Sequence, residues 1–288
     1  MKPPRFKYAA AESIEEAVSI LDQHGDEAKV LAGGQSLIPL MNMRLARPGV
    51  LVDINRVSGL DTITRNGGLT IGALTRQSAV VRSGDVSGFA PIITEALRHV
   101  GHPGIRTRGT LGGSIAHADP AAELPAVLLA LDGEVVARGP GGERTIPAQQ
   151  FFVTNFTTAL APNEVLTSVR FPWSTEKARW AFQEVARRHG DFALAGVASA
   201  AEVEQGVCTS VRIALFAVAD RPLRAARAEE FLAGKSLDDD AVVAEAARLA
   251  CAGLEPSSDF HATGQYRTEA AEALVRRALK HMSSKGGN

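Results

Sequence analysis

The sequence predicts an α+β protein of 288 residues, and three observations carry this expectation. Strands and helices alternate over residues 1–58, hairpins and helices mix over residues 59–175, and strands precede helices over residues 176–288. We therefore expect a first domain over residues 1–175, built from subdomains at about 1–58 and 59–175. A smaller α+β domain follows over residues 176–288.

The first subdomain has the pattern β-α-β-α-β. Ser13 and Glu16 have the spacing of a capping box, and Gly25 is placed to end the helix that they begin. A second, short helix ends before Pro48. The expected strands cover residues 6–9, 29–32 and 50–54.

In the second subdomain, glycine-containing turns separate short strands, and apolar segments indicate helices. The expected strands cover residues 62–64, 69–72, 134–138, 143–146 and 165–171, the first four as two hairpins. The expected helices cover residues 91–100 and 124–131, the latter preceded by acids that suit a first helical turn. Residues 172–177 read as a linker.

The last region begins with strands and ends with helices. The expected strands cover residues 179–186, 193–203 and 207–219, and the expected helices cover residues 223–232, 238–252 and 268–280. Residues 283–288 should fray.

Two similar glycine turns are the strongest chemical signal in the chain. The first glycine turn, residues 32–36, contains Gly33-Gly34 before Ser36, and the second, residues 110–114, contains Gly112-Gly113 before Ser114. Glycine pairs leave no Cβ in the way of a ligand, and amides at the start of a helix attract phosphate. A single pair is usually an ordinary tight turn, and Ser36 or Ser114 alone suits a helix cap. Two such turns indicate one diphosphate ligand held from two sides.

Composition excludes several classes of function. The net charge of −1 gives no reason to expect a nucleic acid, and no apolar run is long enough to span a membrane. Cys208 and Cys251 are isolated, so neither an iron–sulfur cluster nor a disulfide is expected, and the cytoplasm is the default location. His102 and His117 have no partners at metal-ligand spacing.

Other polar residues have two readings. Asp119 suits a cap before Pro120 about as well as a ligand contact, and Glu123 by itself reads as a solvated acid in a first helical turn. Arg187 and Arg188 are either a solvated pair or face a partner subunit.

Together, these motifs resemble the FAD-binding medium subunit of molybdenum hydroxylases of the carbon monoxide dehydrogenase and xanthine dehydrogenase type. The matching segments are both glycine turns, Asp119-Pro120, residues 187–193 and residues 265–267. The resemblance extends over essentially the whole chain. It implies a p-cresol methylhydroxylase-type FAD-binding domain in two α+β subdomains, and then a smaller C-terminal flavoprotein domain.

By position, the resemblance implies which residues contact FAD. They are Val30, Leu31, Ala32, Gly33, Gly34, Gln35, Ser36, Leu37, Gly101, Thr110, Leu111, Gly112, Gly113, Ser114, Glu123, Leu166 and Phe192. It implies neither a catalytic residue nor a metal ligand in this chain. Three positions depart from many relatives: Ser114 replaces Asn, Phe192 replaces Tyr, and Glu184 replaces Lys. These departures put individual contacts to FAD in doubt.

The resemblance implies an electron-transfer subunit. Electrons would pass from [2Fe-2S] clusters in a small subunit to this FAD and on to an acceptor, while a large molybdopterin subunit acts on the reducing substrate. A dimer of heterotrimers would be the assembly. One alternative is a stand-alone FAD-dependent oxidoreductase of the same fold, and another is a nucleotide-binding or scaffold module without a redox role. Neither the reducing substrate nor the acceptor can be read from the sequence.

Overall fold

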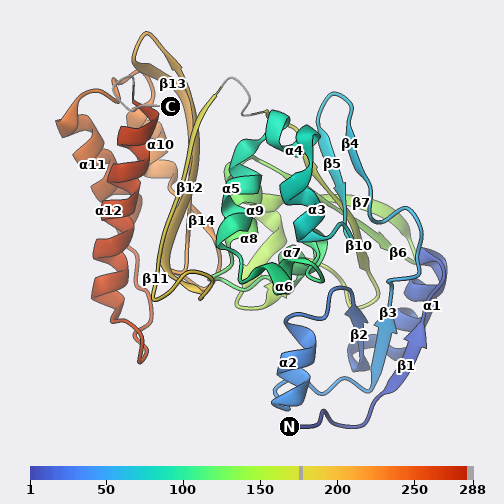
Figure 1. Cartoon of the computed structure of the whole chain (residues 1–288). Coiled ribbons are helices and arrows are strands. Elements are labelled where there is room, and N and C mark those ends of the chain that lie inside the picture. The colour runs from blue at the N-terminus through green and yellow to red at the C-terminus, as the bar shows by residue number, and fades with distance from the viewer. Residues whose placement is uncertain (175–177, 284–288) are drawn as a thin grey trace.

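The computed structural model describes residues 1–174 and 178–283. Part of the expected linker, the expected domain boundary at 175/176 and the tail after residue 283 lie outside the described residues. Figure 1 shows the N-terminal unit at one end and the C-terminal sheet and helices at the other, with an antiparallel sheet and several helices between them.

The N-terminal unit is the expected β-α-β-α-β arrangement. Its elements are β1 (Lys7–Ala10), α1 (Ile14–His24), η1 (Gly25–Glu27), β2 (Ala28–Leu31), α2 (Leu37–Asn42) and β3 (Val50–Asp53). The three strands form a parallel sheet in the order β1-β3-β2. Ser13 caps α1, because its hydroxyl accepts a hydrogen bond from the Glu16 amide over 3.1 Å. Since neighbouring parallel strands end at the same edge, the residues after β2 and β3 lie close together.

The central unit contains a five-stranded antiparallel sheet in the order β4-β5-β10-β6-β7. Its strands are β4 (Ile63–Arg65), β5 (Leu69–Gly72), β6 (Glu134–Gly139), β7 (Gly142–Pro147) and β10 (Val165–Phe171). Its helices are α3 (Gln77–Arg82), α4 (Gly84–Phe89), α5 (Pro91–His99), α6 (Pro103–Arg106), α7 (Leu111–His117), α8 (Glu123–Ala130) and α9 (Ala148–Phe151). A two-stranded ribbon joins β8 (Phe152–Thr154) to β9 (Thr157–Thr158). The sequence reading included the two larger hairpins, β10, α5 and the body of α8, and it missed α3, α4, α6, α9 and the small ribbon.

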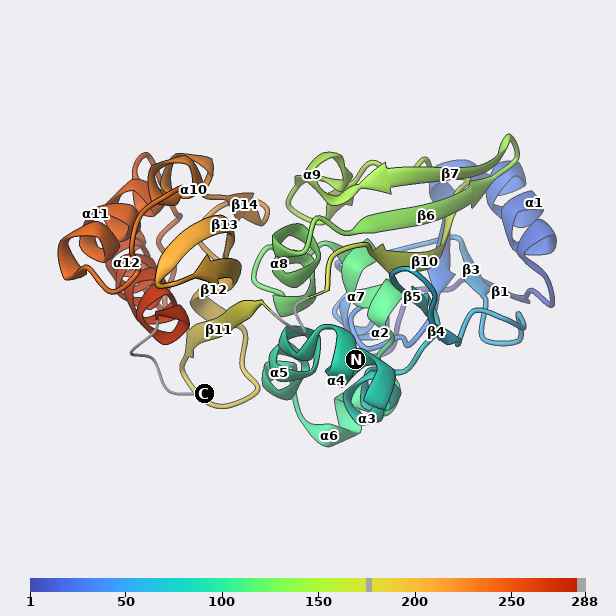
Figure 2. The ribbon, with the colours of Figure 1, turned by 90° about the horizontal axis from the view of Figure 1, so that it is seen from above.

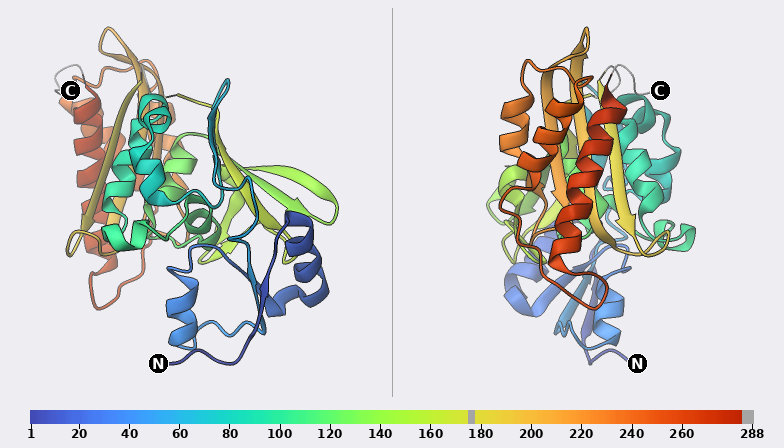
Figure 3. Two further views of the ribbon diagram at one scale, coloured as in Figure 1. Left: turned by 45° about the vertical axis from the view of Figure 1, so that its right-hand side comes forward. Right: turned by 90° about the vertical axis from the view of Figure 1, so that its left-hand side faces the viewer.

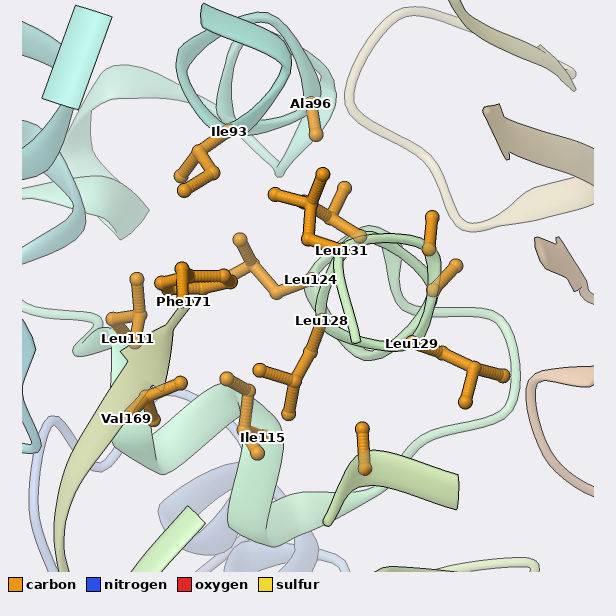
Figure 4. Packing of buried hydrophobic residues seen from close by; sticks show 14 of the residues in the cluster. Ile93, Ala96, Leu111, Ile115, Leu124, Leu128, Leu129, Leu131, Val169 and Phe171 are labelled. Carbon is orange, nitrogen blue, oxygen red and sulfur yellow. The ribbon is translucent and has the colours of Figure 1, made fainter. Parts of the chain in front are cut away.

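Helix α8 is buried along its whole length, including Glu123 in its first turn. Figure 4 shows Leu124 and Leu128 pointing toward Phe171 and the neighbouring helix, whereas Leu129 points away from them. A helix that is apolar on all sides belongs inside a protein, and α8 lies between the central unit and the C-terminal sheet.

The C-terminal unit is an antiparallel sheet in the order β11-β12-β13-β14 with helices on one face. Its elements are β11 (Arg179–Ala186), β12 (Ala193–Glu204), β13 (Val207–Phe216), β14 (Leu223–Arg224), α10 (Ala226–Leu232), α11 (Asp240–Cys251) and α12 (Gly264–Met282). Figure 3 shows α11 and α12 on the outer face of this sheet. The inner face packs on α5 and α8, which Figure 2 shows between this sheet and the central unit.

Polar contacts join the C-terminal sheet to α8 at both ends of the helix. The amide of Ala217 donates to the carbonyl of Pro120 over 2.8 Å just before α8. After α8, the Asp132 carboxylate pairs with Arg212 and, over 2.6 Å, with Arg224. These contacts hold both ends of α8 against the C-terminal sheet.

Candidate cofactor site

A cavity of about 400 Å³ opens at the ends of β2 and β3, where the first glycine turn begins. Such a volume lies within the range of small-molecule sites. Five of the predicted FAD contacts line it: Leu31, Ala32, Gly33, Gly34 and Gln35. Six residues that the sequence reading did not select also line it: Ile38, Pro39, Asn42, Asp53, Asn55 and Arg108.

The first glycine turn presents backbone donors that the protein leaves unused. Within the described residues, none of the amides of residues 33–37 donates a hydrogen bond to a protein atom. Gly34 has φ +71°, which favours glycine, and Ser36 stands at the N-cap position of α2 without making a side-chain cap. Consecutive unused amides beside a cavity can bind an anion.

The second glycine turn has a different role. The amides of Leu111 and Gly112 donate to Thr75 and Ala73 over 3.0 and 3.1 Å. The amides of Gly113 and Ser114 both donate to Thr110, at 3.0 Å to its hydroxyl and 3.1 Å to its carbonyl. The expectation that both turns present free amides therefore holds only for the first turn.

The second turn instead supports the first. A Cβ on Gly33 would overlap the carbonyl oxygen of Arg108 and lie 2.9 Å from the Cα of Gly109. A Cβ on Gly113 would lie 3.7 Å from the Cβ of Ala32. The two turns are thus in direct contact, and Gly33 makes this approach possible because it has no side chain.

Asn55 and Arg76 connect the two glycine turns. Asn55 Nδ2 donates to the carbonyl of Ala32 over 2.9 Å. The Arg76 guanidinium donates to Asn55 Oδ1 and to the carbonyl of Arg108, each over 2.6 Å. We call this set of contacts the Asn55–Arg76 bridge. The sequence held only one local signal for the Asn55–Arg76 bridge. Asn55 comes just after β3, at the edge of the sheet where the first turn also lies.

The electrostatics of the cavity suit an anion. No carboxylate in the described part of the chain pairs with the guanidinium of Arg108, which lines the cavity. Asp53 also lines it, and burial alone would raise the pKa of this carboxyl. Hydrogen bonds from Tyr8 and Asn55 outweigh burial and lower the pKa. The charge of Asp53 is therefore already compensated by protein donors.

The remaining predicted contacts lie outside the lining of this cavity. Leu166 is buried in β10. The loop at Gly190 packs closely against Gly101, since a Cβ on Gly190 would lie 3.1 Å from the Gly101 carbonyl. Phe192, beyond this loop, is 67% exposed. Of these residues, Gly101 and the loop at Gly190 lie where the central and C-terminal units meet.

The reading of Glu123 as a solvated acid is wrong, because the residue is buried. Glu123 is only 6% exposed. Burial raises the pKa of its carboxyl to about 8, and the charge of Glu184 raises this pKa further. The neighbouring Asp119 accepts a hydrogen bond from the Ala121 amide over 2.9 Å, a local cap.

Within the described residues, no group of three or more His, Cys, Asp or Glu side chains could hold a metal ion. His117 packs on the ring of Phe156 at 5.2 Å, and burial lowers its pKa. Over the described residues, no helix combines the length and apolarity needed to cross a membrane.

The fold and the cavity with its unused amides fit a protein that binds a nucleotide cofactor, and comparison with known proteins makes this specific. Residues 4–174 match the FAD binding domain in molybdopterin dehydrogenase, and residues 180–282 match the CO dehydrogenase flavoprotein C-terminal domain. The chain belongs to the family of FAD-binding medium subunits of molybdenum hydroxylases, as the resemblance implied. The prediction of FAD as its cofactor is confirmed.

Individual relatives cover nearly the whole chain. The chain is 44% identical to the 6-hydroxypseudooxynicotine dehydrogenase complex subunit alpha of Paenarthrobacter nicotinovorans, covering 97% of this chain and 95% of the relative. It is 40% identical to the carbon monoxide dehydrogenase medium chain of Hydrogenophaga pseudoflava, covering 97% of both. A solved structure of carbon monoxide dehydrogenase from the same organism superimposes with a TM-score of 0.95 over 98% of both chains.

Proposed function

We propose that this chain carries electrons through FAD, from iron–sulfur clusters in a small partner subunit to an external acceptor. The observation that carries the proposal is the row of amides at residues 33–37, from which no atom of the described chain accepts a hydrogen bond, beside the Arg108 guanidinium, which pairs with no carboxylate of the described residues. Backbone donors and a guanidinium together suit the negatively charged diphosphate of FAD. The bound flavin supplies the capacity to accept and release electrons, and the protein sets its position and surroundings.

The site residues have separate roles in this proposal. The first turn and Arg108 hold the diphosphate, and the hydroxyls of Ser36 and Ser114, neither of which caps a helix, add donors. Val30 and Leu37 flank the first turn, and Thr110, Leu111, Gly112 and Gly113 position it from the other side. Gly101, Glu123, Leu166 and Phe192 surround the flavin ring.

The wider assembly follows from the same family. We propose a large molybdopterin subunit and a small [2Fe-2S] subunit as partners, in a dimer of heterotrimers located in the cytoplasm. Relatives described as a complex subunit and a medium chain support the partners, and the free, buried Cys208 and Cys251 suit a reducing compartment. We place the domain boundary at about residue 175.

Absorbance spectra test this function directly. The chain is purified alone and with the proteins that co-purify with it. We expect flavin bands from the chain alone and additional iron–sulfur absorbance from the complex. The flavin bands of the complex should bleach when its reducing substrate is added. A chain that binds flavin but never co-purifies with an iron–sulfur protein would indicate a stand-alone oxidoreductase. A colourless chain that does not take up added FAD would overturn the proposal.

A further inference from the structure

The cavity at the ends of β2 and β3 contains one negative charge among its donors. Within the described residues, Asp53 is the only acid that lines this cavity. Asp53 ends β3, and in the register of the two parallel strands it pairs with Leu31, which ends β2 and also lines the cavity. The first glycine turn begins at the next residue, Ala32. The carboxylate of Asp53 therefore stands at the same sheet edge as the unused amides.

The Asp53 carboxylate is held in place and still has room for another donor. Its Oδ1 accepts hydrogen bonds from the backbone amide and the Nδ2 of Asn55, over 2.8 and 2.6 Å. Its Oδ2 accepts one from the Tyr8 hydroxyl over 2.7 Å. An ionised carboxylate offers about four acceptor positions and no donor, so Oδ2 can accept a further hydrogen bond. A ligand group that completes this set must be a hydroxyl or an amine.

Charge separates two parts of the cavity. Burial would raise the pKa of the Asp53 carboxyl, but the hydrogen bonds from Tyr8 and Asn55 lower it, so the group is ionised at neutral pH. A phosphate next to Asp53 would meet a like charge, whereas the unused amides of residues 33–37 and the Arg108 guanidinium attract one. The diphosphate of a dinucleotide therefore suits the amides, and an uncharged donor suits Asp53.

The order of the elements along the chain indicates which donor this is. β2, the first glycine turn, α2 and β3 follow one another, and β2 and β3 are parallel neighbours. In a dinucleotide-binding βαβ unit, a glycine turn after the first strand meets the diphosphate, and an acid about 20 residues further on binds the ribose of adenosine. Asp53 has the corresponding position relative to Gly33, at the end of the second strand.

We propose that Asp53 binds the ribose hydroxyls of the adenosine half of FAD and selects a nucleotide whose ribose carries no phosphate. This inference rests on the proposed function, because it takes the first glycine turn as the diphosphate site. A ribose hydroxyl donates a hydrogen bond to Oδ2 of Asp53. A phosphate in place of that hydroxyl would be repelled by the carboxylate. In this arrangement, the adenosine half lies beside the end of β3.

Binding of FAD and of an FAD analogue tests the proposal. The analogue contains 2′,3′-dideoxyadenosine and so lacks both ribose hydroxyls. The full chain is freed of flavin, and the dissociation constant of each ligand is measured from the quenching of flavin fluorescence. We expect the wild type to bind FAD about tenfold to a hundredfold more tightly than the analogue, because a hydrogen bond to a charged group is a strong one.

Variants of Asp53 assign this preference to the carboxylate. Asp53→Ala should bind the two ligands with nearly equal affinity. Asp53→Asn should show an intermediate preference, since a neutral amide oxygen is a weaker acceptor than a carboxylate. The control Asp26→Ala, which removes an exposed acid of the same unit, should keep the wild-type preference. If Asp53→Ala does not fold, Asp53→Asn carries the same comparison.

The ratio of the two dissociation constants separates a ribose contact from other roles of Asp53. An aspartate that only orders the turn at Asn55, or that contacts the ribityl chain of the flavin half, would leave this ratio unchanged in Asp53→Ala while weakening both ligands. That result, or a wild type that binds FAD and the analogue equally, would overturn the ribose contact and leave the proposed function intact. A wild-type chain that binds neither ligand would overturn the proposed function, and this inference with it.

Discussion

The guanidinium of Arg76 lies 2.6 Å from the side-chain carbonyl of Asn55 and links two glycine turns that are far apart in the sequence. Asn55 holds the carbonyl of Ala32 in the first turn, and Arg76 holds the carbonyl of Arg108 just before the second. The unused amides of the first turn therefore owe their position to side chains beyond the turn itself. A preorganised donor set binds its ligand at a lower entropic cost than a mobile one.

We expect Arg76→Ala to weaken FAD binding about tenfold to a hundredfold, because hydrogen bonds that involve a charged group contribute about 1.5–3 kcal/mol. Arg76→Lys should recover only part of this loss, since an ammonium group does not reproduce the planar geometry of a guanidinium. The dissociation constant is measured from the quenching of flavin fluorescence. Arg248→Ala, which removes an exposed ion pair with Glu245, is the control. Equal affinities in both alanine variants would show that the bridge does not position the site.

Arg108→Ala should weaken FAD binding and make the remaining affinity less dependent on salt, because the variant has lost a charge that lines the cavity. The measurement is the FAD dissociation constant at two or more ionic strengths. Arg82→Ala, which removes an exposed charge at the end of α3, provides the comparison. If Arg108→Ala and Arg82→Ala bind FAD with the same salt dependence, Arg108 does not contact the diphosphate.

Gly33→Ala should separate the two turns and lower both flavin retention and the melting temperature. Its Cβ would overlap a backbone carbonyl, which has less freedom to move than a side chain. The matched control is Gly104→Ala in the nearby α6, where a Cβ would meet open space. Flavin content after gel filtration and a thermal melt are the measurements. Wild-type flavin content in Gly33→Ala would contradict the contact between the turns.

The free energy of unfolding should fall as the pH rises from about 4.5 to about 8, by up to about 1 kcal/mol per pH unit. In this window, the unfolded chain has lost the proton of Glu123, whereas the folded chain still holds it. His99, whose pKa is also raised, changes stability in the same direction as the pH passes its folded pKa. Glu123→Gln should flatten the dependence, as measured by urea denaturation at several pH values. A slope as steep as that of the wild type would rule out Glu123 as its source.

Much of the fold was accessible from the sequence, because long amphipathic or alternating segments specify their own structure. The capping box at Ser13, the hairpins of the central sheet and the strands β11 and β12 lie where these patterns predicted. The strand expected over 207–219 ends at Phe216, and the helix expected from residue 223 begins only after the short strand β14. Helices α3 and α4 were missed, since each has six residues and so offers too few turns for a periodic pattern to emerge.

The site was predicted less completely than the fold. The first glycine turn was found because glycine pairs have a local meaning, but the Asn55–Arg76 bridge depends on residues brought together only by the fold. Glu123 was misread for a related reason. Acids usually begin helices in water, and only the packing of the C-terminal sheet on α8 buries this one. The amides of Leu111 and Gly112 in the second turn are likewise bonded to the carbonyls of Thr75 and Ala73, which lie far from them in the sequence.

The complete burial of α8 has a consequence for how the chain folds. The helix contributes side chains to the same hydrophobic cluster as strands β12 and β13, so neither neighbouring unit can complete its interior without it. The central and C-terminal units should therefore melt in one cooperative transition, although they match separate family models. Two segments that match separate family models thus form a single thermodynamic unit.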